Sequence, residues 1–175
     1  SFYNVCRKFP GNQYYIIICP NLAAQIKQED FPDNFKFYVI KQRPATNIFY
    51  FVKMMRWLNR LEKRIKPDCV ISTGGHGYWR PKVPIVGGFN LPHYIYPESG
   101  YFKIITLRKR VYWYFMRKIH LFFYNRLDAV IVQTNDVNTR LRKILHSDIP
   151  IYTVSNTVNS FFVNYERYPN RLPPK

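Results

Sequence analysis

The sequence predicts an α/β fold: a doubly wound, mostly parallel Rossmann-like sheet with helices on both faces. Short apolar runs recur along the chain without the polar alternation of a half-exposed sheet, which is typical of strands buried on both faces. Stretches with helical spacing separate several of these runs. Polar or glycine-rich loops follow three of them, at the edge where open parallel sheets bind their ligands.

The expected elements follow in chain order. Strands are predicted at 13–19, 35–40, 68–73, 83–89, 127–134 and 149–155. A helix with apolar residues at helical spacing from Ile48 to Ile65 is expected to end at Lys66-Pro67. A second helix is expected over about 102–124, and a third over 135–146 with Thr134 or Asn135 as its N-cap.

Length and composition indicate one domain, or half of a larger enzyme. The chain has 175 residues, of which 47% are hydrophobic and 18% aromatic; this is enough for a packed core and excludes a disordered composition. We assign 1–165 to a Rossmann-like domain and 166–175, which is rich in proline, to the start of an interdomain linker. Because residues 1–9 resemble the end of a helix, we expect a first strand and its glycine-rich loop upstream.

The net charge of +17 indicates a polyanionic partner, either nucleic acid or an anionic membrane surface. No apolar run approaches the ~18–20 residues of a membrane span. The region 103–126 has seven basic and no acidic residues, interleaved with aromatic side chains, a pattern typical of a helix that lies on an anionic bilayer. The predicted membrane-surface residues are Lys103, Arg108, Lys109, Arg110, Trp113, Arg117 and Lys118. Nucleic-acid binding is the alternative, although no known nucleic-acid-binding motif is present.

The first rich loop contains Gly74, Gly75 and His76. A phosphate-binding loop needs glycines that open directly onto a helix, but Tyr-Trp-Arg-Pro follows Gly77 and no Lys-Ser/Thr pair is present. We therefore exclude a nucleotide P-loop. The glycines are expected to let the backbone approach a ligand or turn sharply, and His76 is either a structural loop residue or part of a site.

No metal site is predicted. His93 and Glu98 are five residues apart, which fits neither a helical pair of ligands nor an H-E-x-x-H motif. The three cysteines have no C-x-x-C spacing.

The order of the motifs resembles the N-terminal, acceptor-binding domain of group 1, or family four, glycosyltransferases, which have the two-Rossmann-domain GT-B fold. The motifs are "KPDCVIST" before the Gly/His loop, "VPIVGGFN", the basic helix, "LDAVIVQTNDVNTRL" and "YTVSNTVNSFF". They run from about Asn47 to the end. Thr134 stands at the family's Ser/Thr position, and Asn156 matches the Asn of its last turn. Asn159 replaces the usual Asp, and Asn90 stands where many members have a His.

The resemblance implies a retaining transfer of a sugar from a nucleotide-sugar to a glycan or lipid-linked acceptor in cell-surface polysaccharide synthesis. It implies no cofactor and no metal, with the donor bound mainly by a C-terminal domain outside this chain. The expected location is cytoplasmic, peripheral on the inner face of the cell membrane, and this chain alone is expected to be inactive. The acceptor-cleft candidates are Gly74, Gly75, His76, Asn90, His93, Glu98, Thr134 and Asn156. A non-catalytic, membrane-recruiting half of a two-subunit enzyme is the alternative.

Overall fold

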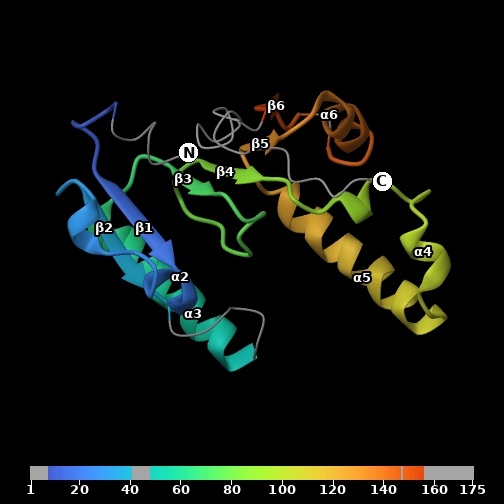
Figure 1. Cartoon of the computed structure of the whole chain (residues 1–175), viewed down its shortest axis with the longest axis horizontal. Helices are drawn as coiled ribbons and strands as arrows, with labels where there is room; N and C mark the ends of the chain where they lie inside the picture. The colour runs from blue at the N-terminus through green and yellow to red at the C-terminus, as the bar shows by residue number, and fades with distance from the viewer. Residues whose placement is uncertain (1–7, 41–47, 147, 156–175) are drawn as a thin grey trace, which may run out of the picture. The chain divides into compact units, whose positions relative to one another are not determined.

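The structure, a computed structural model, describes residues 8–40, 48–146 and 148–155. The chain divides into two compact units, with the boundary between Met54 and Met55. Figure 1 labels the elements of both units, and each unit is described by itself.

The first unit contains a two-stranded parallel sheet. Strand β1 (Tyr14–Ile18) pairs with β2 (Phe35–Val39), and Tyr14 stands opposite Phe35. The short helix α2 (Pro20–Ala23) and the 3-10 helix η1 (Gln28–Asp30) connect the two strands. Gln28 closes this connection by donating from Nε2 to the carbonyl oxygen of Phe35 at 2.9 Å.

The second unit contains a four-stranded sheet in which every neighbouring pair is parallel. Its strands are β3 (Val70–Ser72), β4 (Ile85–Gly88), β5 (Ala129–Val132) and β6 (Ile151–Thr153), in the order β3-β4-β5-β6. Figure 1 shows this sheet with helix α5 beside it. The prediction of an α/β fold with parallel strands and flanking helices is confirmed. The described strands form two sheets where the sequence predicted one, and each strand is shorter than its apolar run.

The core of the second unit lies between the sheet and its helices. Strand β5 is apolar throughout and largely buried, as expected of a central parallel strand. The buried cluster contains Ile85, Phe89, Tyr94, Ile95, Tyr124, Leu127, Val130, Val132, Leu141, Leu145, Ile149 and Ile151.

Helix α3 (Ile48–Ile65) ends where the sequence predicts. Lys66 has a φ of 46°, and Pro67 cannot continue the helix. Glu62 is 8% exposed although it is charged, because its Oε1 accepts a hydrogen bond from the backbone N–H of Lys82 at 2.5 Å. This bond ties the last turn of α3 to the segment that enters β4.

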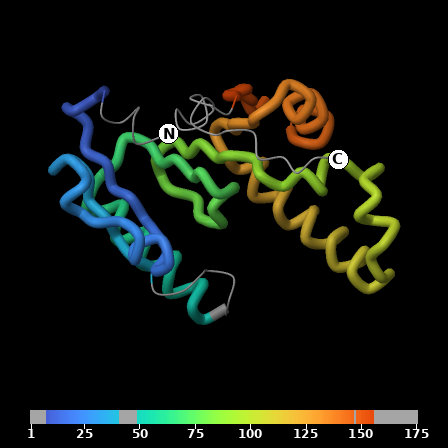
Figure 2. Tube along the Cα trace, in the orientation of Figure 1, coloured from blue at the N-terminus to red at the C-terminus, as the bar shows by residue number. Residues whose placement is uncertain are grey.

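The prediction of a single helix over about 102–124 is wrong. The segment forms two helices, α4 (Tyr101–Ile104) and α5 (Leu107–Tyr124). Ile105 and Thr106 are extended, and the Thr106 hydroxyl accepts from the backbone N–H of Lys109 as the N-cap of α5. Helical spacing alone did not reveal this break, because a threonine fits both a helix interior and a cap. Figure 2 shows the chain reversing direction between the two helices. Trp113 Nε1 donates to the hydroxyl of Tyr101 at 3.1 Å and so holds α4 against α5.

Helix α6 (Asn135–Arg142) packs against β5 and β6. Its predicted N-cap is confirmed, since the Thr134 hydroxyl accepts from the backbone N–H of Val137 at 3.3 Å. The helix ends four residues before the predicted His146.

Candidate functional site

The carboxyl ends of four parallel strands meet at one edge of the second unit's sheet. The strands end at Ser72, Gly88, Val132 and Thr153, and all pair in parallel. The loops that carry most of the predicted cleft residues therefore leave the sheet on the same side. Open parallel sheets bind their ligands at this edge.

The first of two open hollows at this edge has a volume of about 310 Å³. Asn90 contributes from the loop after β4, and Gln133 and Thr134 contribute from the end of β5. Phe89, Pro92 and Val137 complete the lining. The hollow thus brings together Asn90 and Thr134, two predicted cleft residues that are far apart in sequence.

The second hollow has a volume of about 400 Å³ and shares Pro92 with the first, so the two adjoin. His93, Tyr96, Glu98 and Ser99 complete its lining. His93 and Glu98, which have no metal-ligand spacing, therefore meet around one open surface. Together the hollows offer amide, hydroxyl, imidazole and carboxylate groups beside flat apolar surface, which is the chemistry that binds a polar, many-hydroxyl ligand.

Asn90 also fixes the shape of the edge. Its Nδ2 donates to the carbonyl oxygen of Thr73 at 3.0 Å and ties the end of β3 to the end of β4. Among the described residues its Oδ1 has no partner, and the side chain is exposed. A ligand hydroxyl at this point would therefore meet a free acceptor held in place by its own amide nitrogen.

The glycine pair before Asn90 allows β3 and β4 to approach this closely. A Cβ on Gly88 would lie 3.0 Å from the carbonyl oxygen of Thr73, and one on Gly87 would lie 3.1 Å from the carbonyl oxygen of Gly75. In the preceding loop Gly75 has a φ of 135°, which disfavours any side chain. The sharp turn predicted for the loop glycines fits the φ of Gly75, and their predicted approach to a ligand stays a prediction. The close packing of β3 and β4 at Gly87 and Gly88 was not predicted.

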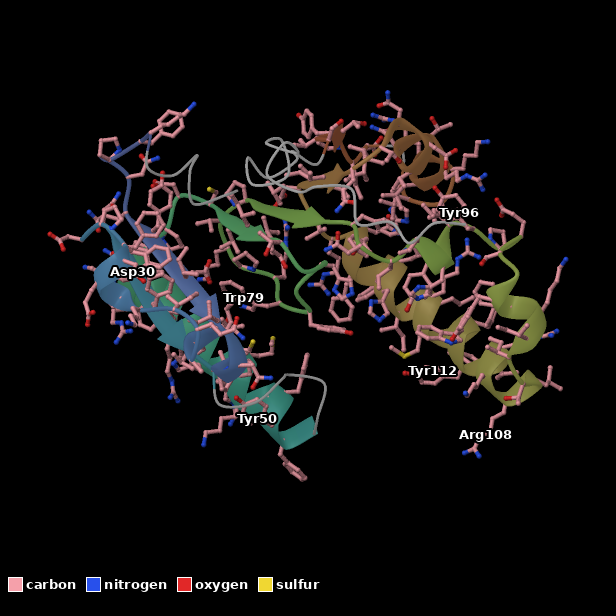
Figure 3. All side chains as sticks on the ribbon, in the orientation of Figure 1. Asp30, Tyr50, Trp79, Tyr96, Arg108 and Tyr112 are labelled. Carbon is pink, nitrogen blue, oxygen red and sulfur yellow. The ribbon has the colours of Figure 1, made fainter. Side chains whose placement is uncertain are left out.

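The wall of the second hollow is organised by Arg140 of α6. Its Nη1 forms an ion pair with Glu98 Oε1 at 2.6 Å, and its Nε pairs with Asp136 at 3.2 Å. The guanidinium also lies 4.5 Å from the centre of the Tyr96 ring, and the Tyr96 hydroxyl donates to Asp136 at 2.5 Å. Figure 3 labels Tyr96 in this group.

These contacts keep both carboxylates ionised at neutral pH. A hydrogen bond from its own backbone N–H, and then the bond from Arg140, lower the pKa of Glu98 below its ordinary value. The Tyr96 hydroxyl and then Arg140 lower the pKa of Asp136. Glu98 is therefore suited to accept hydrogen bonds from ligand hydroxyls, not to donate a proton.

His76 does not line either hollow. It is 4% exposed, and its ring stacks on Phe123 at 5.2 Å and meets Tyr124 edge-on at 4.9 Å between ring centres. Its Nε2 lies 2.6 Å from Nδ1 of His120, a residue of α5. His76 thus anchors the glycine loop to the helix behind it.

The hydrogen bonds around His76 assign the tautomers. The backbone N–H of Tyr78 donates to Nδ1 of His76 at 3.2 Å, so neutral His76 carries its proton on Nε2 and donates to His120. His120 then carries its own proton on Nε2, which lies 3.4 Å from the Tyr78 hydroxyl oxygen. Burial, and secondarily the nearby His120, lowers the pKa of His76 to about 4, so the pair is neutral at pH 7.

Several residues that shape the edge were not predicted from sequence. Tyr124, fully buried on α5, donates from its hydroxyl to the carbonyl oxygen of Gly88 at 3.2 Å. Asp128, also not predicted, lies at the opposite end of the sheet, where β4 and β5 begin. It accepts two bonds from Arg80, at 2.7 and 2.9 Å, and one from the backbone N–H of Ile85 at 2.8 Å. Tyr124 could have been found by its helical spacing from Trp113, Arg117 and His120. The partners of His76 and Asp128 lie more than 40 residues away, and sequence spacing gives no indication of them.

The other predicted cleft residues lie as follows. Gly74 is exposed and Gly75 is buried in the β3–β4 loop. Asn156 lies outside the described residues, as does the predicted linker at 166–175. Within the described ranges, no group of three or more His, Cys, Asp or Glu side chains lies close enough to hold a metal ion. No helix among the same residues is long and apolar enough to cross a membrane.

Comparison with known proteins supplies the family. Neither the curated proteins nor the solved structures contain a match to this chain. The family model of Glycosyltransferase Family 4 matches residues 2–160, which is most of the chain and begins well before Asn47, where the motifs quoted above begin. Its match includes both hollows and the His76–His120 pair. The chain therefore belongs to glycosyltransferase family 4.

Proposed function

We propose that the two adjoining hollows bind the acceptor of a retaining glycosyltransferase. The observation that carries this proposal is the convergence of Asn90, Thr134, His93 and Glu98 on one open surface at the carboxyl edge of the sheet. The family match supports glycosyl transfer in general. The choice of acceptor side rests on the resemblance to N-terminal domains of the group 1 enzymes.

The proposed reaction places limited chemical demands on these residues. The sugar donor is a nucleotide-sugar, held mainly by a C-terminal domain outside this chain, and its diphosphate is the leaving group. A diphosphate oxygen takes the proton of the acceptor hydroxyl, so this side of the site needs no strong base. Its task is to hold the hydroxyl in line and to exclude water. Asn90 Oδ1 and the Glu98 carboxylate are placed to accept hydrogen bonds from neighbouring hydroxyls. No metal and no cofactor take part in this proposal.

The acceptor is a glycan or a lipid-linked sugar in cell-surface polysaccharide synthesis, presented at the inner face of the cell membrane. The net charge of +17 supports a peripheral position on an anionic surface. On this proposal the 175-residue chain by itself transfers no sugar, because the donor site is elsewhere.

The direct test is a transfer assay with the chain joined to its donor-binding domain. Radiolabelled nucleotide-sugars are offered with polyprenyl-diphosphate-linked and soluble glycan acceptors, and the anomeric configuration of the product is read by NMR coupling constants. We expect one donor to give a product with the donor's own configuration. An inverted product would contradict the retaining mechanism. Activity that appears only on addition of a separate polypeptide would favour the two-subunit alternative.

A further inference from the structure

The outer face of α5 is apolar although it is exposed to solvent. We define this face as Leu107, Val111, Phe115, Ile119 and Phe122, which are exposed by 75%, 49%, 58%, 46% and 55%. Steps of three and four residues place all five within one sector of the helix. Scattered exposed apolar side chains are ordinary, but a continuous row marks an interaction surface.

Basic side chains lie beside this apolar row, the arrangement that is typical of a helix on a membrane surface. Lys118 lies with Nζ 4.9 Å from the centre of the Tyr114 ring, and Arg126 lies with its guanidinium 5.3 Å from the centre of the Phe122 ring. Figure 3 labels Arg108, whose side chain extends away from the helix. The segment 103–126 contains no acidic residue. Long basic side chains can therefore reach lipid phosphates while the aromatic rings lie deeper.

Two of the residues predicted to touch the membrane belong to the opposite face. Trp113 is half-buried, donates to Tyr101 and packs its ring 4.5 Å from that of His93. Arg117 is also half-buried, with its Nε shielded from solvent. The basic helix therefore has an inner face built into the fold of the second unit, and among the described residues its outer face is the exposed one.

We infer that the outer face of α5 inserts into the headgroup region of an anionic lipid bilayer, with the helix lying in the membrane plane. This deepens the proposed peripheral location and rests on it. The row runs from Leu107 to Phe122 along this 18-residue helix and is about 23 Å long. A nucleic acid would satisfy the basic residues, but its surface gives no apolar environment to Val111, Leu107 and Ile119. A bilayer satisfies both the charge and the apolar row.

The test measures flotation of the protein with vesicles of neutral phosphatidylcholine, with and without anionic phosphatidylglycerol. We expect binding at least about tenfold tighter to the anionic vesicles, weakening as salt rises. Phe115→Ser with Phe122→Ser should reduce that binding about tenfold or more, as should Arg108→Glu with Lys118→Glu. The first matched control is Tyr152→Ser with Val154→Ser, exposed apolar residues of and after β6. The second is Lys63→Glu with Lys143→Glu, exposed bases in α3 and at the C-cap of α6. Both controls should bind like the wild type.

Insertion has a second readout that does not depend on affinity. A tryptophan introduced by Phe115→Trp should be quenched by brominated lipid tails, and one introduced by Tyr152→Trp should not. Circular dichroism checks that each variant is folded.

Four outcomes would overturn the inference. Two concern the vesicle assay: the control variants lose as much binding as the test variants, or the protein binds neutral and anionic vesicles equally. The other two would identify a different partner. Either the protein binds RNA but not vesicles and the Phe115 and Phe122 changes weaken the RNA binding, or it forms a concentration-dependent dimer that these changes abolish. The vesicle assay contains neither donor nor acceptor. Its failure would leave transfer to a soluble acceptor in detergent as a separate test of the proposed function.

Discussion

The two faces of α5 reverse the usual arrangement of a surface helix. Its inner face contains His120, Arg117 and Trp113, together with the hydroxyl of Tyr124, and these polar groups are half-buried or buried. Its outer face is a row of exposed apolar residues. Polar groups in a protein interior usually find partners, as His120 does with His76, whereas the buried Nε of Arg117 has no hydrogen-bond partner among the described residues. The inner face therefore holds the β3–β4 loop through the His76–His120 contact, and the exposed outer face is the surface that we propose meets the bilayer.

The largest expected effect is a difference in folding stability between substitutions at two aromatic residues of α5. Tyr124→Ala removes a fully buried ring and the bond to Gly88, so we expect a loss of about 3–5 kcal/mol in the free energy of unfolding. Phe122→Ala, on the outer face, should cost less than about 1 kcal/mol. Urea denaturation of both variants measures the contrast. Similar losses in the two would break the assignment of inner and outer faces.

The buried histidine pair should make stability depend on pH. The pKa of His76 is about 4 in the folded protein and about 6.5 in an unfolded chain, so the unfolded state binds more protons between these values. The contribution of neutral His76 to the free energy of unfolding is therefore complete above pH 6.5. As pH falls towards 4, up to about 3 kcal/mol of this contribution is lost. Burial also lowers the pKa of His120, which adds in the same direction.

Chemical denaturation of the wild type and His76→Gln across this pH range measures the effect. The variant should be less stable at pH 7, since it disturbs a buried hydrogen-bonded pair, but its slope below pH 6.5 should be smaller. An unchanged slope would mean that His76 does not titrate as its burial requires.

Alanine substitutions at two glycines, Gly88 and Gly100, test how tightly β4 packs at the edge that α5 supports. Gly88→Ala would place a Cβ 3.0 Å from the carbonyl oxygen of Thr73, and we expect a loss of about 1–3 kcal/mol. Gly100→Ala is the matched control, because nothing lies within 4 Å of its Cβ position and its φ is −54°. The control should be neutral or slightly stabilising. Thermal melts that rank the two variants in the opposite order would contradict this packing.

The smallest expected effect on folding belongs to the outer face. Phe115 is 58% exposed, so Phe115→Ser should change the free energy of unfolding by no more than about 0.5 kcal/mol. The same variant should weaken vesicle binding. A large loss of stability, measured by urea denaturation, would instead mean that this ring packs within the protein.

The sequence predicted the positions of the strands well because each strand lies in a continuous apolar run. Burial on both faces was predicted correctly for β5, whereas β1, β2, β3 and β6 are only partly buried. The end of α3 and the Thr134 cap were also predicted, since proline and threonine act on their immediate neighbours. The break at Thr106 was missed because its cap competes with a strong helical pattern on both sides. The orientation of α5 was predicted only in part, because both faces contain aromatic and basic residues.

The candidate site was likewise predicted in part: its position was predicted from the sequence, but its long-range contacts were not. Asn90, Thr134, His93 and Glu98 follow strand ends, and a parallel sheet brings strand ends together whatever the details of packing. The burial of His76 depends on His120, 44 residues away, and Glu98 depends on Arg140, 42 residues away. Such long-range pairs are set by the packed fold, and local patterns do not specify them.

The most direct test of the acceptor site compares two exposed asparagines in steady-state transfer by the chain joined to its donor-binding domain. Asn90 lines the first hollow, whereas Asn59 lies on α3 and accepts from Trp79 Nε1 at 2.7 Å outside both hollows. We predict that Asn90→Ala lowers kcat/KM for the acceptor about tenfold or more while the KM for the nucleotide-sugar stays unchanged, and that Asn59→Ala alters neither. Equal effects of the two substitutions, or a change confined to the nucleotide-sugar KM, would contradict an acceptor site at the ends of β4 and β5.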